Sequence, residues 1–202
     1  MAIEHKVRQV EELFDRLEIE ITAFKSETHL FCNVGCGKCC STPDIDASPL
    51  EFLPWAFHLF LNGKAEEMLL ELSKASNSNC LIYRPLSLLE QHNGSCSNYR
   101  YRGLICRLFG YAASRDKYGK LRLAACKIIK DEQSQNFNAA EEAIRNGLYV
   151  LVFTDYYMQL AQIDYRMGTT LLPINQALKI AIEEVLQYYA YRPFPGGLEN
   201  IA

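Results

Sequence analysis

The stretch Cys32-Asn33-Val34-Gly35-Cys36-Gly37-Lys38-Cys39-Cys40 decides how the rest of the chain is interpreted. It places four thiols within nine positions, and its two glycines allow the backbone to turn tightly between them. Thiolates at this spacing can converge on one metal centre, and soft sulfur ligands select zinc, copper(I) or iron–sulfur centres over magnesium or calcium. The stretch therefore predicts a metal-binding loop.

The vicinal pair Cys39-Cys40 adds a constraint, because neighbouring side chains of an extended backbone point to opposite faces. Either the loop is folded so that both thiols aim inward, or one of them faces another centre. Four more cysteines follow downstream, which makes eight in 202 residues. A chain of this length can build a hydrophobic core without disulfide bonds, and the sequence shows no export signal. Metal binding is therefore favoured over a disulfide framework.

A second motif, Cys96-Ser-Asn-Tyr99-Arg-Tyr-Arg102-Gly-Leu-Ile-Cys106-Arg107, supports the first. Together the two motifs resemble the YkgJ-like cysteine-cluster family, the CxxCxxCC zinc- or iron-chelating domain. In that family the signature precedes a pattern of cysteine, tyrosine, arginine-proline and cysteine-arginine, and Cys80 stands where a preceding family cysteine does. The resemblance covers about residues 32–126. Two details differ: three residues separate Cys32 from Cys36, and Gly103 replaces the usual proline.

The resemblance implies a cysteine-bound metal or iron–sulfur centre but no settled reaction, although relatives include domains of flagellin lysine methyltransferases. We favour an iron–sulfur cluster, with zinc as the alternative, since both accept four thiolates. Spacing and resemblance together predict eight metal ligands. These are Cys32, Cys36, Cys39, Cys40, Cys80, Cys96, Cys106 and Cys126.

Three residues of the second motif are predicted to lie around the centre. Arg102 and Arg107 are expected to stabilise an anionic, thiolate-rich centre by charge or by hydrogen bonds to sulfur. Tyr99 is expected to pack over it. The alternatives are a surface ion pair for the arginines and a core position for the tyrosine. His29 lies three residues before Cys32 and is a conceivable additional ligand, whereas the other three histidines lack a partner spacing; all four are left out of the site.

Hydrophobic periodicity predicts helices on both sides of the cysteine region. Apolar residues from Ile3 to Phe24 recur at steps of four and three, which indicates one long amphipathic helix. Ser48-Pro49-Leu50-Glu51 predicts a capped helix start, Asn62-Gly63 its end, and a short helix follows from Glu66 to Lys74. In the C-terminal third, Asn138 to Glu141 predicts the start of a run to about Met167. Pro173 then opens a last helix.

The segment between Cys80 and Cys126 is predicted to be loops and short strands rather than helix, because residues 76–79 and 91–97 are polar and turn-rich. Residues 114–120 predict a hairpin turn that brings the neighbourhoods of Cys106 and Cys126 together. We therefore expect a mainly α protein. A helical bundle should hold a cysteine-rich loop and a short β-hairpin region at one end. We expect one domain over 1–202, with the cysteine region at about 32–126 and helical flanks at 3–28 and 138–191.

Composition limits the partners. The chain is 49% hydrophobic and 22% charged, as in ordinary globular proteins, and its net charge of -3 offers no positive field for nucleic acid. The charged N-terminal segment lacks the apolar core of a secretory signal, and no window is apolar enough for a membrane span. The expected partner is a metal ion or cluster, in the cytoplasm, without nucleic acid or membrane. No protein partner is identifiable from the sequence.

Two competing functions were weighed. The spacing of Cys32, Cys36 and Cys39 also matches the cluster loop of radical S-adenosylmethionine enzymes, but those resemble β/α barrels, and this chain lacks the alternation of strands and helices that such a fold needs. The other competitor is a structural zinc module, for which eight cysteines would provide two closed sites. No nucleotide loop or nucleophile–base motif appears, so whether the protein is an enzyme stays open.

Overall fold

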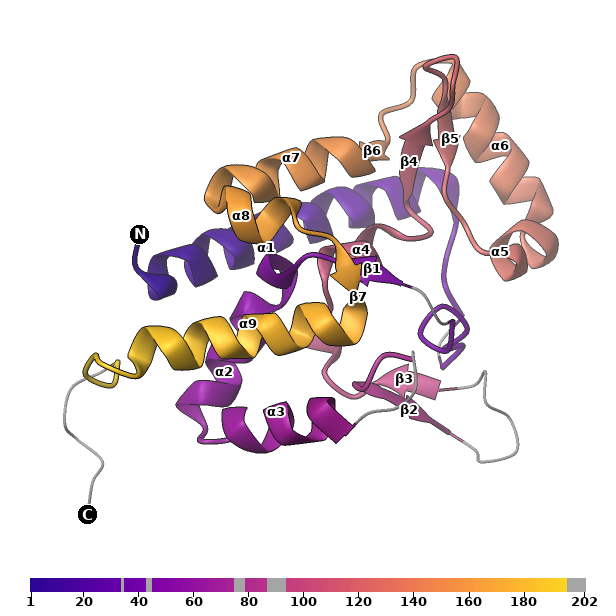
Figure 1. Ribbon diagram of the computed structural model, residues 1–202. Helices are drawn as coiled ribbons and strands as arrows, with labels where there is room; N and C mark the ends of the chain where they lie inside the picture. The colour runs from indigo at the N-terminus through magenta and orange to yellow at the C-terminus, as the bar shows by residue number, and fades with distance from the viewer. Residues whose placement is uncertain (34, 43–44, 75–78, 87–93, 196–202) are drawn as a thin grey trace.

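The computed structural model describes all residues except 34, 43–44, 75–78, 87–93 and 196–202. Of the polar stretches at 76–79 and 91–97, residues 76–78 and 91–93 lie outside the described residues, whereas residues 94–96 form a short strand. The described part is mainly helical with short strands, as predicted (Figure 1). Its core is a continuous cluster of buried side chains that runs from Ile3 in the first helix to Tyr189 in the last.

The first helix, α1 (Ile3–Thr28), follows the predicted periodicity. Its buried stripe includes Val10, Leu13 and Leu17, each at most 1% exposed. Burying such side chains contributes roughly 1.5–3 kcal/mol each, which fixes the face that α1 turns to the core. His29 ends the helix in the left-handed conformation (φ 54°), so the chain leaves α1 sharply toward the cysteine loop.

The predicted capped start at Ser48 is confirmed. The helical segment begins after Ser48 with a 3₁₀ turn, η1 (Pro49–Phe52), and continues as α2 (Leu53–Leu61). The chain then turns at Gly63 and enters α3 (Ala65–Lys74). The last helix, α9 (Ile174–Tyr189), packs against η1, α2 and α3, while α1 packs against α2. Helix α2 therefore packs against both α1 and α9.

The predicted helical run from Asn138 to Met167 is wrong at its start and in its continuity. Helix α6 (Ser134–Arg145) begins earlier, so Asn138 lies inside it, and Gly147 breaks the run at φ 100°. After strand β6 (Leu151–Val152) come α7 (Phe153–Ile163) and α8 (Tyr165–Thr169). Asp164 caps α8 by accepting the Met167 N–H at 2.9 Å. A left-handed glycine and a new N-cap thus divide the run, and α7 packs against α1.

The described strands form three small sheets, two of which join segments that are distant in sequence. Strand β1 (Asp46–Ala47) pairs antiparallel with β7 (Leu172–Pro173), and β2 (Tyr83–Pro85) pairs antiparallel with β3 (Gly94–Cys96). Strand β4 (Ala112–Arg115) lies between β5 (Leu121–Leu123), its antiparallel partner, and β6, its parallel partner. Pairing with β4 holds residues 151–152 extended, which is a long-range reason why the predicted helix cannot continue through them.

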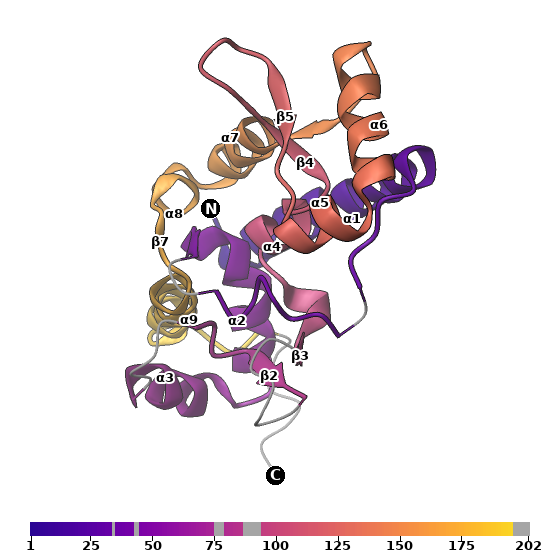
Figure 2. The ribbon, with the colours of Figure 1, turned by 90° about the vertical axis from the view of Figure 1, so that its right-hand side faces the viewer.

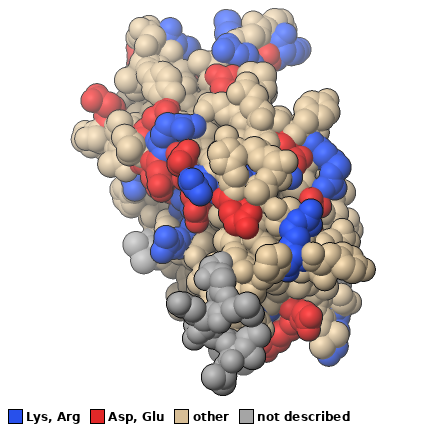
Figure 3. All heavy atoms as spheres, turned by 90° about the vertical axis from the view of Figure 1, so that its left-hand side faces the viewer, with Lys and Arg blue, Asp and Glu red and all other residues tan. Residues whose placement is uncertain are grey.

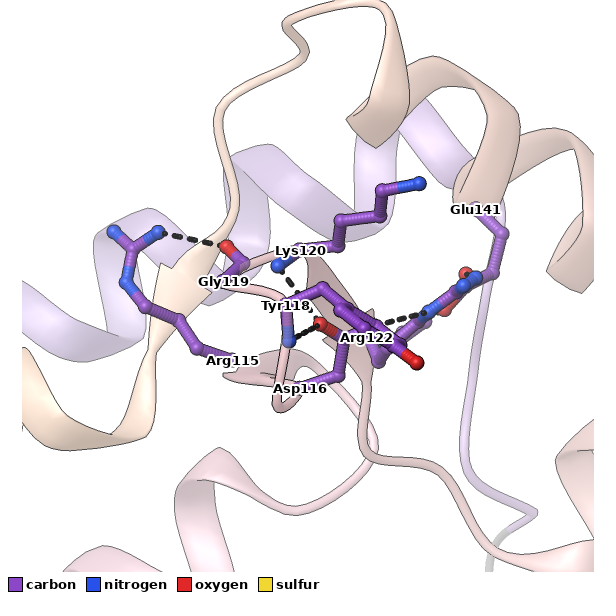
Figure 4. A network of polar contacts seen from close by, with 8 residues as sticks. Arg115, Asp116, Tyr118, Gly119, Lys120, Arg122 and Glu141 are labelled. Atoms are coloured by element: carbon purple, nitrogen blue, oxygen red, sulfur yellow. Dashed lines mark hydrogen bonds and ion pairs between the residues drawn. The ribbon is translucent and has the colours of Figure 1, made fainter.

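The predicted hairpin is confirmed, with β4 beginning at Ala112. Asp116 holds its turn by accepting the N–H groups of Tyr118 (2.8 Å) and Lys120 (3.0 Å) (Figure 4). Glu141 of α6 accepts the Leu123 N–H at 2.7 Å and lies 3.4 Å from an Arg122 nitrogen. Glu141 was expected in a helix-capping signal; instead it joins the hairpin to α6.

The cysteine-bearing segments gather at one end of the helices, beside the C-terminal end of α1 and the N-terminal end of α9 (Figure 1). Figure 2 looks onto this end and shows the loop after α1 passing between helix α5 (Lys127–Glu132) and the β2–β3 hairpin. On the face shown in Figure 3, acidic and basic side chains are interspersed. In the described part of the chain, no helix is both long and apolar enough to cross a membrane.

Candidate metal centre

A cavity of about 480 Å³ opens among the cysteine-bearing segments. Apolar side chains, among them Phe52, Ile82, Ile105 and Ile174, make most of its wall. Six of the eight cysteines line it. They are Cys39, Cys40, Cys80, Cys96, Cys106 and Cys126.

The first cysteine loop reaches the cavity through its two glycines. Gly35 and Gly37 have φ of 72° and 58°, the left-handed region that favours glycine. The carbonyl of Gly35 accepts the Gly94 N–H at 2.9 Å, and a Cβ on Gly37 would lie 2.8 Å from the Gly94 nitrogen. The glycines therefore let the loop lie directly on strand β3, and Cys39 and Cys40 line the same cavity as Cys96.

The vicinal thiols Cys39 and Cys40 interact with each other. A hydrogen bond from Cys40 lowers the pKa of Cys39 to about 6, and the same bond, with burial, raises the pKa of Cys40. Both line the same cavity, so the loop is folded to aim both thiols inward. This is the first of the two arrangements that the sequence allowed.

The hairpin β2–β3 carries two further cysteines to the cavity. Cys96 lies opposite Tyr83 in the antiparallel register, and the Cys80 carbonyl accepts the Tyr83 N–H at 3.1 Å. Burial raises the pKa of Cys80 to about 11 and also raises the pKa of Cys96. Burial without a cation favours the neutral thiol, so a bound metal would have to displace these protons.

Cys106 lies on a helix, α4 (Leu104–Leu108), where loops and strands were predicted. The sequence shows no cap for this helix, because its N-cap residue is Gly103. The cap comes from Glu51, whose Oε2 accepts the Ile105 N–H at 2.9 Å from 54 positions away. A Cβ on Gly103 would lie 2.8 Å from Phe52 Cζ and 2.9 Å from that carboxylate oxygen. Close packing therefore explains the glycine at the family's proline position.

Cys126 is the N-cap of α5, and its sulfur accepts the Ile129 N–H at 3.5 Å. Cys32 and Cys36 do not line the cavity. Cys32 is exposed, and its backbone N–H donates to the Tyr111 hydroxyl at 3.0 Å. Although Cys32 is exposed, surrounding atoms partly desolvate its thiol and raise its pKa, and the thiols of Cys39, Cys36 and Cys126 add to the rise, so Cys32 lies within electrostatic reach of these three cysteines.

The thiols are neighbours but are not yet arranged as ligands. In the described part of the chain, no three Cys, His, Asp or Glu side chains are grouped so that they could hold one ion. The eight cysteines there carry no disulfide. The expected meeting of Cys39, Cys96 and Cys106 at one place, with Cys80 and Cys126 close by, is seen as a shared cavity. Cys36 lies outside its wall.

Arg102 lines the cavity, and its guanidinium lies 3.7 Å from the ring centre of Tyr99. Its buried Nε has no hydrogen-bond partner among the described residues. Arg102 also lowers the pKa of Cys39, among smaller contributions. Tyr99 itself is 64% exposed and holds Arg102 rather than lining the cavity. An all-thiol donor set with an orphaned cationic N–H beside it fits a soft, anionic metal centre.

Arg107 faces away from the cavity. Its Nη1 donates to Glu18 of α1 at 2.6 Å, its Nε donates to the Arg102 carbonyl at 3.0 Å, and it lies over the Phe14 ring. Burial lowers the pKa of Arg107, and the Glu18 carboxylate opposes that shift. Arg107 thus ties α4 to α1 and supports the backbone of Arg102.

Three residues contact the cysteine-bearing segments although nothing in the sequence assigns them to the site. Glu51 was expected only as a helix cap, and Gln133 and Asn175 were not singled out. Each side chain bonds to the backbone beside a cysteine-bearing position more than 50 residues away. A lone polar residue at such a distance has no recognisable spacing, so only the tertiary structure identifies it.

The fold and the cavity define a class: a mainly helical protein with a thiol-lined cavity suited to a soft metal. The family model CxxCxxCC, described as "Putative zinc- or iron-chelating domain", matches residues 31–141, more than half of the chain. The chain belongs to this family, and its metal-binding character follows from that membership. No curated protein and no solved structure matches the chain.

Proposed function

We propose that the protein binds an iron–sulfur cluster in the cysteine-lined cavity and serves in electron transfer or as an accessory to a modification reaction. The observation that carries this proposal is the cavity itself. Five separate segments contribute six cysteines to one space of about 480 Å³. A lone zinc ion is enclosed by four thiolates at about 2.3 Å and needs no such space. The volume falls in the range of small-molecule and cofactor sites, roughly 300–1,000 Å³.

The cavity-lining thiols are the proposed ligands, with Cys32 and Cys36 as neighbouring thiols of the same loop. Bound cluster would supply one-electron chemistry. The protein would supply the thiolates, the apolar wall that limits water, and Arg102, whose free Nε–H would donate to sulfur. Tyr99 would keep Arg102 in place, and Arg107 would act through the backbone of Arg102. Free thiols in such number suit a reducing compartment, and we propose the cytoplasm.

Zinc is the second candidate, because the family description includes it and eight cysteines suffice for two closed sites. The two candidates differ in what purified protein contains. Protein isolated without air is expected to be brown and to hold iron with acid-labile sulfide. Colourless protein with stoichiometric zinc would instead support a structural zinc module.

Single substitutions at the cavity test whether the thiols share one centre. Replacing Cys106 by Ser, or Cys39 by Ser, is expected to remove the metal and to lower the melting temperature, because metal binding stabilises the folded state. Loss of half the metal would indicate two separate centres. A variant with full metal and an unchanged melting temperature would show that its cysteine is not a ligand. Thr42→Ser, at the cavity rim, is the matched control.

A further inference from the structure

Three cysteine-bearing segments are each held by a polar side chain from a different part of the fold. In every case the bond goes to the backbone beside the cysteine and leaves the thiol free. This pattern points to a set of residues whose work is to fix the ligands in position. The three side chains belong to Asn175, Gln133 and Glu51.

Asn175 holds the Cys80 segment on both sides. Its Oδ1 accepts the Leu81 N–H at 2.9 Å, and its Nδ2 donates to the Asn79 carbonyl at 2.8 Å. The amide group therefore clamps the backbone around Cys80 with two bonds of ordinary hydrogen-bond length. Asn175 stands in the first turn of α9, a helix outside residues 31–141, so the C-terminal flank reaches into the site.

Gln133 clamps the start of the cysteine loop in the same way. Its Oε1 accepts the Phe31 N–H at 3.0 Å, and its Nε2 donates to the Phe31 carbonyl at 2.7 Å, directly before Cys32. Gln133 is 9% exposed, so both bonds are largely shielded from water. Glu51, 1% exposed, holds Ile105, directly before Cys106, and also receives a hydrogen bond from Tyr157 of α7.

We propose that Asn175, Gln133 and Glu51 are positioning residues that preorganise the cysteine-bearing segments for metal. The inference rests on the proposed metal centre. Fixing a residue's backbone costs conformational entropy, and without the clamps that cost would be subtracted from the binding free energy for each loop. Residues that orient ligands typically contribute 10- to 100-fold in metal affinity. Glu51 lies in η1, Gln133 between α5 and α6, and Asn175 in α9, and all of these elements contribute side chains to the hydrophobic core, so the clamps transmit its rigidity to the loops.

Asn175 offers the sharpest test, because its two bonds described above both go to the backbone around Cys80. In Asn175→Ala both bonds are lost, and we expect the affinity for Co²⁺, followed by its thiolate charge-transfer absorption, to fall about 10- to 100-fold. In metal-free protein, alkylation of Cys80 by iodoacetamide should become several-fold faster, while alkylation of Cys126 stays unchanged. Asn62→Ala is the matched control, because the Asn62 side chain donates to the His58 carbonyl at 2.7 Å, at the end of α2, a helix that carries no cysteine.

Unchanged Co²⁺ affinity together with unchanged Cys80 alkylation would overturn the proposal. A general loss of stability alone would not produce a change in alkylation rate that is confined to Cys80. Should Asn175→Ala fail to fold, Asn175→Asp keeps the acceptor for Leu81, loses the donor to Asn79 and sets a carboxylate oxygen against the Asn79 carbonyl. It must then show the same effects selective for Cys80, or the proposal fails. Wild-type protein that takes up neither Co²⁺ nor iron would refute the proposed function, and the Cys80 alkylation would still decide the clamp.

Discussion

At the scale of single residues, the pair Cys39 and Cys40 carries a testable proton distribution. The Cys40 thiol donates to the Cys39 sulfur and lowers the pKa of Cys39 to about 6, so metal-free protein should hold a Cys39 thiolate at neutral pH. In Cys40→Ala the donor is gone and the pKa of Cys39 should rise. Its alkylation should become several-fold slower at about pH 7 and should match wild type at about pH 10, when both are thiolates.

Mass-spectrometric alkylation rates across pH measure this effect, and Cys126→Ala serves as the control because the main causes of the pKa shift of Cys39 are Cys40, burial, backbone hydrogen bonds and Arg102, not Cys126. Equal rates for wild type and Cys40→Ala at neutral pH would contradict the hydrogen bond. The sign follows from the state that the bond favours: a donor to the thiolate lowers its pKa, and removing that donor raises it.

Gly37 is the residue on which the approach of the cysteine loop to β3 depends. Gly37→Ala places a Cβ 2.8 Å from the Gly94 nitrogen in a left-handed conformation, so strain and overpacking should together cost about 2–5 kcal/mol of unfolding free energy. Gly63→Ala has a similar φ, and its Cβ would meet nothing within 4 Å. Its cost should be about 1–2 kcal/mol, from strain alone. Urea denaturation of both variants measures the difference, and equal costs would rule out the close contact.

At the scale of elements, the β4–β5 hairpin depends on helix α6. Glu141→Ala leaves the Leu123 N–H without its acceptor, so the variant should lose about 1–3 kcal/mol of stability. Hydrogen exchange of residues 112–123 should accelerate before exchange elsewhere. Glu142, its exposed neighbour on the same helix, is the control, and Glu142→Ala should change stability by less than about 0.5 kcal/mol. Unaltered hydrogen exchange in the Glu141 variant would show that the β4–β5 hairpin is stable without its contact to α6.

At the scale of the whole molecule, metal should stabilise one end of the fold. Removing it with a chelator is expected to lower the melting temperature and to speed hydrogen exchange in the cysteine-bearing segments between residues 80 and 126. Exchange in the middle of α1 and α9 should stay slow, because their buried faces contact the hydrophobic core and carry no cysteine. Uniform acceleration over the whole chain would instead mean that the core cannot form without metal. The expectation of one domain over 1–202 stays a prediction.

The sequence by itself determined the elements whose pattern is local. Helix α1 follows from its stripe of apolar residues, the start of η1 follows from Ser48 and Glu51, and the hairpin follows from its turn residues. The family and the preference of the cysteine thiols for soft metals could also be predicted from the sequence, because both depend on residue type and close spacing. Periodicity and capping act over a few residues, so a reading along the chain captures them.

Only the tertiary structure decided the rest. Helix α4 forms at Cys106 because Glu51 caps it from afar, and the run after Asn138 is broken because residues 151–152 pair with β4. Arg107 turns to Glu18 instead of the cavity for a similar reason: α1 offers a carboxylate within 2.6 Å. The clamps of Asn175 and Gln133 join positions about 100 residues apart. Such contacts are decided by which surfaces the folded core brings together, and no local spacing records them.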